Sequence, residues 1–382
     1  MQSSMARYIF IVLALGITVF ILTTFRASRH LLPANFGPNL LDDAKQNGTD
    51  LLRVRNATLG FQEIKVISMS SRSDKRDAWA VASTMSDFVV QIVDGVDGSS
   101  VSPQALPYTM DLKPGVVGCW RAHMDVLRDI VNRKVSSALI FEDDADWDVS
   151  LKSQLVQFAR GSRWILNQTD DEPHHSPYGD GWDMLWIGHC GSRPDPWDNR
   201  RFVIPHDPTT EPRDIRTAVA LPDYDYWPED LQPRLVYSQY YGVCTNAYAV
   251  TLAGAMKILY NLSMLPNNGP VDIGLGDMCR DKTDDFNCIG PSPALIGLHR
   301  PAGNPSRWSD IENNQGEDSY AASSPGLMYP VRMNIARLLK GETIFKTDKG
   351  TTIGVEEMSL ADIQAPTGHG EVVEISQHDA IL

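Results

Sequence analysis

The chain has 382 residues, of which 42% are hydrophobic, and a formal net charge of -14 at pH 7. This length suits one large domain or two ordinary ones, and the hydrophobic content suffices for a substantial core. The acidic balance and the lack of a Lys- or Arg-rich block argue against nucleic acid as the main partner, because phosphate binding needs concentrated positive charge. An anionic ligand can still bind locally where a divalent metal supplies that charge.

An uncharged apolar stretch, YIFIVLALGITVFILTTF, lies at residues 8–25. A helix of this length spans most of a bilayer core of about 30 Å. The stretch is longer than the core of about 7–15 residues in a signal peptide, so we predict a transmembrane signal-anchor after a short cytosolic tail at 1–7. The expected product is a single-pass type II membrane protein of the Golgi or endoplasmic reticulum with its bulk in the lumen. A cleaved signal peptide is the alternative.

Composition divides the rest of the chain. Residues 26–60 are polar and predict a stem, 61–312 carry the regular elements, and the acidic segment 313–382 predicts a largely flexible tail. The five cysteines form no CxxC motif, which argues against a zinc ribbon. In an oxidising compartment we expect Cys279 and Cys288 to close a short loop, and the odd count leaves at least one thiol unpaired.

Short strands alternate with helical segments from residue 61 onward. The expected strands are 64–70, 87–95, 137–142 and 183–188, and the expected helices are 116–133, 151–166 and 251–262. This alternation predicts an α/β fold with a mostly parallel sheet. Two long loops, 167–182 and 191–235, are rich in Asp, Pro, His and Trp, and loops of such length are usually functional.

The expected strand at 137–142 ends in a cluster of carboxylates. In LIFEDDADW the apolar run leads directly into Glu142, Asp143 and Asp144. Ligands of an α/β sheet gather at the carboxyl ends of its strands. Several carboxylates at one buried point stay ionised only beside a compensating cation, so the cluster indicates a hard divalent ion.

Three kinds of metal site compete for this cluster. A calcium loop fails because Val149 and Leu155 stand where an EF-hand needs Gly and Glu. A hydrolase site normally adds a motif such as HExxH, which the sequence lacks. Mg²⁺ or Mn²⁺ that bridges a nucleotide diphosphate to the protein suits the pattern best. An acidic turn that caps the strand without a metal is the alternative.

Three blocks in a fixed order carry a family resemblance: GVVGCWRAH (115–123), ALIFEDDADW (138–147) and WDMLWIGHCG (182–191). With the later P-V-D motif and PALIGLHR, they resemble glycosyltransferase family 25, which includes bacterial lipooligosaccharide and collagen galactosyltransferases. The resemblance covers roughly residues 62–311, so 61–312 is the expected catalytic domain. Ala122 departs from the family's usual Ser, and the segment 191–235 has no match.

The resemblance implies a GT-A-like fold and a metal-dependent, inverting hexosyltransferase. The expected donor is a UDP-sugar, commonly UDP-galactose, with Mn²⁺ or Mg²⁺, and the expected acceptor is a glycan or glycoprotein in the secretory pathway. The alternatives are a catalytically inactive, membrane-anchored relative that binds glycans or acts as a scaffold, and a lumenal calcium-binding scaffold.

For the metal, Asp144 is the first candidate, Glu142 a second or water-mediated contact and His299 a third ligand. The alternative for His299 is an ordinary hydrogen-bonded histidine. Asp143 is expected to bind hydroxyls of the donor sugar or ribose.

Arg72 and Arg76 follow the first strand, where the nucleotide is expected. Their guanidinium groups can bind phosphate or stack on a base. A solvated basic turn is the alternative. Arg121 and His123 lie at a helix start, which is a natural anion site. His123 has a packing role as its alternative.

Inversion needs one general base for the acceptor hydroxyl. Asp272 is the candidate because it lies in the P-V-D motif, with Asp277 as the alternative. Trp186, Trp197 and Trp227 are candidates for stacking on sugar faces.

Overall fold

The computed structural model describes residues 50–170, 173–213, 216, 229–311 and 315–347, together with the backbone strands at 358–359 and 371–374. The predicted signal-anchor at 8–25 lies outside the described residues, as do most of the predicted stem and part of the predicted tail.

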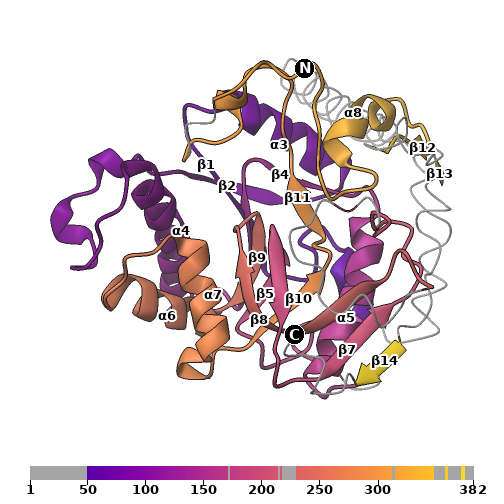
Figure 1. Ribbon diagram of the computed structural model, residues 1–382, viewed down its shortest axis with the longest axis horizontal. Coiled ribbons are helices and arrows are strands. Elements are labelled where there is room, and N and C mark those ends of the chain that lie inside the picture. Colours follow the sequence, from indigo (N-terminus) through magenta and orange to yellow (C-terminus); the bar gives the residue numbers. More distant parts are fainter. Residues whose placement is uncertain are drawn as a thin grey trace, which may run out of the picture. The chain divides into compact units, whose positions relative to one another are not determined.

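A ten-stranded mixed sheet forms the centre of the fold (Figure 1). Its strands are β1 (Glu63–Ser68), β2 (Val90–Asp94), β3 (Ser137–Glu142), β5 (Met184–Gly188), β6 (Gly191–Pro194), β7 (Arg200–Ile204), β8 (Arg234–Val243), β9 (Ala247–Thr251), β10 (Cys288–Ser292) and β14 (Glu371–Glu374). They run in the order β14-β7-β8-β10-β5-β9-β3-β1-β2, and β6 pairs with β8.

The expectation of a mostly parallel sheet in a GT-A-like fold is wrong. Parallel pairing joins β1 to β2, β1 to β3 and β5 to β10. The other pairs are antiparallel, including β9 with both β3 and β5. A parallel return needs a crossover connection, usually a helix. The described part of the chain between β5 and β9 forms strands instead, so β9 enters the sheet in the opposite direction.

Helices cover both faces of this sheet (Figure 1). They are α3 (Ser73–Met85), α4 (Pro114–Arg133), α5 (Leu151–Ile165), α6 (Leu252–Leu259), α7 (Val271–Asp281) and α8 (Val331–Leu339). One buried apolar cluster joins the sheet to α3, α5 and α8, and a second joins it to α4, α6 and α7. Apolar area on both faces is thereby removed from water, which is the main stabilisation of such a layered fold.

Shorter elements complete the chain. Two small antiparallel pairs form from β4 (Ala145–Trp147) with β11 (Ile296–Leu298), and from β12 (Ile344–Phe345) with β13 (Met358–Ser359). Short 3-10 turns occupy Leu51–Arg55, Gly98–Ser100, Pro103–Ala105, Thr283–Asp285 and Pro305–Arg307, and a π turn occupies Tyr260–Met264.

Two disulfides are present. The expected Cys279–Cys288 bridge is confirmed, and a second bridge joins Cys190 to Cys244. Cys119 is the free thiol.

The predicted boundaries of the stem, domain and tail stay predictions, although some residues outside 61–312 join the core. Leu51 and Val54 are buried in the first cluster, and so are Tyr329, Val331 and Phe345 from the region that we assigned to a flexible tail. The acidic composition of that tail hid one amphipathic helix, α8, whose apolar residues pack beside α3.

The membrane prediction is corrected. None of the helices in the described ranges is long and apolar enough to cross a bilayer. The described structure therefore does not support the single-pass anchor or the type II topology and Golgi or endoplasmic reticulum location that we derived from it.

Candidate functional site

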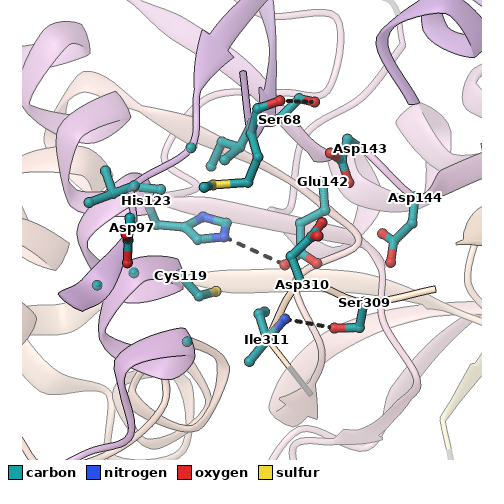
Figure 2. A pocket seen from close by; sticks show the side chains of 18 of the residues that line it. Ser68, Asp97, Cys119, His123, Glu142, Asp143, Asp144, Ser309, Asp310 and Ile311 are labelled. Atoms are coloured by element: carbon teal, nitrogen blue, oxygen red, sulfur yellow. Dashed lines mark hydrogen bonds and ion pairs between the residues drawn. The ribbon is translucent and has the colours of Figure 1, made fainter. Parts of the chain in front are cut away.

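A cavity of about 300 Å³ opens where the parallel strands β1, β2 and β3 end. Parallel neighbours place their carboxyl ends at one edge of the sheet, which is where such folds bind ligands. The lining comes from β1 and the turn after it, the loop after β2, the first turns of α4, the acidic turn after β3, and residues 309–311 (Figure 2).

Backbone rather than side chains forms one wall of this cavity. A Cβ added to Gly98 would lie 1.8 Å from the carbonyl oxygen of Pro114, and a Cβ on Gly118 would lie 2.3 Å from that of Val96. The loop after β2 therefore packs directly against the start of α4, which only glycine permits. Gly115 and Gly118, from the first turns of this 20-residue helix, line the cavity.

Glu142 is held from two sides. The hydroxyl of Thr245 donates a hydrogen bond to its Oε1. Nε2 of His123 lies 3.5 Å from the same oxygen (Figure 2). Burial raises the pKa of Glu142. The contacts with His123 and Thr245 and the positive charge of Lys75 together lower this pKa by more, so the net shift is downward. Glu142 is consequently a carboxylate at neutral pH.

Asp143 is paired with a lysine that the sequence pattern did not reveal. Nζ of Lys75, from α3, lies 2.6 Å from Oδ1 of Asp143 and 3.3 Å from Oδ2 of Asp310. Both partners of the first pair are buried, and buried ion pairs depend on good geometry to offset their desolvation. Lys75 thus supplies one positive charge to a wall that carries several carboxylates.

Asp144 has the least compensated carboxylate of the acidic turn. Its Oδ1 is buried and has no hydrogen-bond partner within the described structure. Burial and the negative charges of Glu142 and Asp143 raise the pKa of Asp144 to about 7, although Lys75 opposes this shift. An unpaired buried oxygen facing a cavity beside a second carboxylate is the donor set that Mg²⁺ or Mn²⁺ prefers, so these residues fit a divalent ion.

A second group of potential ligands lies beside the first. Among the residues described, Cys119, His123 and Glu142 are the three side chains whose ligand atoms come within 4.8 Å of one another. Cys119 and His123 are one turn apart on α4. Nδ1 of His123 lies 2.9 Å from the hydroxyl of Tyr248, which orients the ring and leaves Nε2 facing Glu142. Burial raises the pKa of the Cys119 thiol.

The predicted arginines do not line the cavity. Arg72 forms ion pairs with Asp74 and Asp310, and Arg76 bonds the carbonyl of Ser68 and the carboxylate of Asp94. Arg121 pairs with Asp125 and lies over the ring of Trp120. These contacts brace the elements around the cavity, and a role in gripping the ligand stays a prediction.

His299 lies next to the acidic turn but points elsewhere. Its backbone N–H donates to the carbonyl of Asp144, while Nδ1 lies 3.0 Å from the hydroxyl of Ser324 and 3.8 Å from Oδ2 of Asp146. Burial and the positive charge of Arg332 lower the pKa of His299 to about 4. The structure does not bring its imidazole together with Glu142 and Asp144 as a ligand set.

Asp272, the predicted base, lies outside the cavity lining at the start of α7. Its Oδ2 accepts from the backbone N–H of Cys244, at 2.9 Å, and its Oδ1 accepts from that of Ile273. Asp277 instead pairs with Arg280. Of the candidate tryptophans, Trp186 is fully buried, Trp197 is 68% exposed, and Trp227 lies outside the described residues.

The chain is similar to members of glycosyltransferase family 25, which confirms the predicted resemblance. It is 23% identical over 280 residues to procollagen galactosyltransferase 2 of Mus musculus, a match that covers 67% of this chain and 38% of the mouse protein. It is 25% identical over 215 residues to procollagen galactosyltransferase 1 of Danio rerio, covering 53% and 29%. No protein-family model matches the chain.

A third relative differs in its description. The human protein named inactive glycosyltransferase 25 family member 3 is 24% identical over 219 residues, or 54% of this chain and 30% of its own length. The chain therefore spans well under half the length of the curated relatives that it matches. Two of these relatives are thus named as galactosyltransferases, and the third is named as inactive.

Proposed function

We propose that the chain transfers a hexose, galactose as first choice, from a UDP-sugar to a hydroxyl group of a glycan or glycoprotein acceptor, with inversion and with Mn²⁺ or Mg²⁺. The observation that carries the proposal is the unpaired, buried carboxylate oxygen of Asp144 in a cavity at the ends of parallel strands. The similarity to galactosyltransferases supports galactose as the first choice.

Asp144 and Glu142 would hold the divalent ion, which when bound supplies positive charge against the leaving diphosphate. The start of α4 adds backbone N–H groups and the positive end of a helix dipole, a combination that binds phosphate. Lys75 keeps Asp143 paired and balances part of the local negative charge. His123 and Thr245 fix the orientation of Glu142.

Asp272 is the proposed general base. Two backbone N–H groups, from Cys244 and Ile273, hold its carboxylate in one orientation, as a base that must meet a hydroxyl in a defined geometry requires. The acceptor hydroxyl would transfer its proton to this carboxylate as the new glycosidic bond forms and the bond between the sugar and UDP breaks.

The test uses the full chain with a panel of UDP-sugars and of glycan and glycoprotein acceptors, in Mn²⁺ and in a chelator, and follows release of UDP. We expect turnover of one sugar that disappears in the chelator and in Asp144→Asn. Asp87→Asn, which alters an exposed carboxylate paired with Lys152, is the control and should leave turnover unchanged. Turnover that persists in the chelator would contradict the metal-dependent proposal.

A catalytically inactive binding protein is the second candidate, because one of the relatives is described as inactive. That candidate predicts Mn²⁺-dependent binding of UDP, measured by calorimetry, without release of UDP from any sugar in the panel. If UDP does not bind, both candidates fail and the acidic turn is a strand cap.

A further inference from the structure

A second hollow, of about 490 Å³, lies outside the cavity already described. It is bounded by β6, β8 and α7, and its lining includes Cys190, Arg193, Tyr240, Tyr241, Val243 and Arg280. Helix α7 packs closely here, since a Cβ on Gly276 would lie 2.7 Å from the ring of Tyr241. The lining combines two tyrosines with two arginines, so the hollow offers apolar faces and hydrogen-bond donors together.

Three consecutive residues join this hollow to the first cavity. Val243 lines the hollow. The N–H of Cys244 holds the carboxylate of Asp272, and the hydroxyl of Thr245 holds Glu142 in the wall of the first cavity. Consecutive Cα atoms are about 3.8 Å apart, so the Cα atoms of Val243 and Thr245 are at most about 7 Å apart and one short segment contacts both walls.

The carboxylate of Asp272 lies at this junction. Its Oδ2 accepts from the backbone N–H of Cys244, which lies between Val243 in the wall of the hollow and Thr245, the partner of Glu142 in the wall of the first cavity. Asp272 is thereby held beside the segment that contacts both walls. A general base has to occupy such a position between donor and acceptor.

The aromatic side chains at the hollow match the chemistry of a sugar ring. Trp197, which is 68% exposed, meets Tyr240 edge to face with ring centroids 5.6 Å apart. Aromatic rings that combine an apolar face with a polar edge suit a ligand that has apolar C–H faces and polar hydroxyls. Arg193 is exposed at the same place and offers a fork of N–H donors. Arg280 is already paired with Asp277 and Asp281.

We propose that the hollow between β6, β8 and α7 binds a pyranose ring of a glycan acceptor and presents its hydroxyl toward Asp272. This inference rests on the proposed transferase function and names the acceptor class and its subsite. Tyr240 and Trp197 stack on the ring, and Arg193 bonds its hydroxyls.

The experiment is saturation-transfer NMR on the full chain with methyl glycosides of galactose, glucose, mannose and N-acetylglucosamine. We expect transfer to at least one glycoside, and we expect its loss in Tyr240→Ala and in Arg193→Ala. Arg193 is exposed, so its variant keeps the fold even if the Tyr240 variant does not. Tyr320→Ala, which removes a fully exposed tyrosine elsewhere, is the matched control and should keep the signal.

Binding of UDP with Mn²⁺ distinguishes failure of the acceptor subsite from failure of the proposed transferase function. Unchanged UDP affinity in the Tyr240 and Arg193 variants, with loss of the glycoside signal, supports the acceptor subsite. UDP binding without any glycoside signal, or a glycoside signal that survives both substitutions, overturns the subsite and leaves the proposed function standing. Binding of a Gly-Pro-Pro repeat peptide in place of every glycoside would also overturn it, in favour of a peptide acceptor. Failure of UDP binding with an intact glycoside signal would overturn the proposed transferase instead.

Discussion

Nζ of Lys75 lies 2.6 Å from Oδ1 of Asp143, and this pair joins α3 to the acidic turn that ends β3. The two side chains are 9% and 10% exposed. Lys75 therefore supplies part of the positive charge that the carboxylate cluster requires. Asp144 is the carboxylate whose negative charge is least compensated.

Lys75→Met is expected to lower the free energy of unfolding by about 3–5 kcal/mol, because removing one partner leaves a buried charge unpaired. Urea denaturation measures this change. Lys152→Met is the matched control, since Lys152 and Asp87 are 26% and 81% exposed and such a pair contributes at most about 1 kcal/mol. Similar losses in the two variants would contradict the structural role of Lys75.

Asp144 should make stability depend on pH in the metal-free protein. Its pKa rises from 3.8 to about 7 on folding, so the native state keeps a proton that the unfolded chain has lost. Its stabilising contribution is complete below about pH 4 and disappears as pH rises through 7, a change on the order of 4 kcal/mol. Urea denaturation at several pH values should show a smaller decline for Asp144→Asn and in Mn²⁺. An unaltered decline in both cases would contradict this prediction.

His299→Gln is expected to leave Mn²⁺ affinity within about twofold, because its imidazole bonds Ser324 rather than facing the cavity. Asp144→Asn should reduce that affinity by about 100-fold or more, since it removes a charged oxygen ligand. Calorimetric titration with Mn²⁺ compares the two variants. Comparable losses would show that His299 is a ligand after all, as we first predicted.

Cys119, His123 and Glu142 should bind a softer ion than Mn²⁺, because thiolate and imidazole ligands favour Zn²⁺ and Co²⁺. Titration with Co²⁺ should give a thiolate charge-transfer band that Zn²⁺ displaces and Cys119→Ser abolishes. The other four cysteines form disulfides, so no other thiol can produce this signal. A band that remains in Cys119→Ser would rule the site out.

The Cys190–Cys244 bridge should act on both stability and turnover. By loop-closure entropy, replacing both cysteines with Ser costs about 4 kcal/mol for a separation of 54 residues, against about 2.5–3 kcal/mol for the separation of 9 at Cys279–Cys288. The backbone N–H of Cys244 also orients Asp272, and this segment is less restrained without the bridge. We therefore expect kcat to fall in the Cys190/Cys244 double variant while UDP affinity persists. Equal effects on kcat in both double variants would contradict this link.

The order of local elements was predictable from the sequence because hydrophobic periodicity reports which face of a segment is buried. The strands β1 and β3 and the helices α4 and α5 lie close to where the pattern placed them. Helix α3 was missed because its first turn, SDKR, resembles a solvated loop. The antiparallel direction of β9 was also missed. Strand direction depends on how the long segment after β5 returns to the sheet, and this return leaves no signal in the local sequence pattern.

The same division applies to the candidate site. That Glu142, Asp143 and Asp144 end a buried strand was predictable without the structure, because a carboxylate cluster after an apolar run can be recognised in the sequence. Which of these carboxylates is paired depends on the tertiary structure, because Lys75 and Thr245 reach the site from remote elements. It likewise decided that the carboxylate of Asp272 lies beside the backbone N–H of Cys244. Such contacts depend on packing between distant segments, and packing is a property of the whole fold.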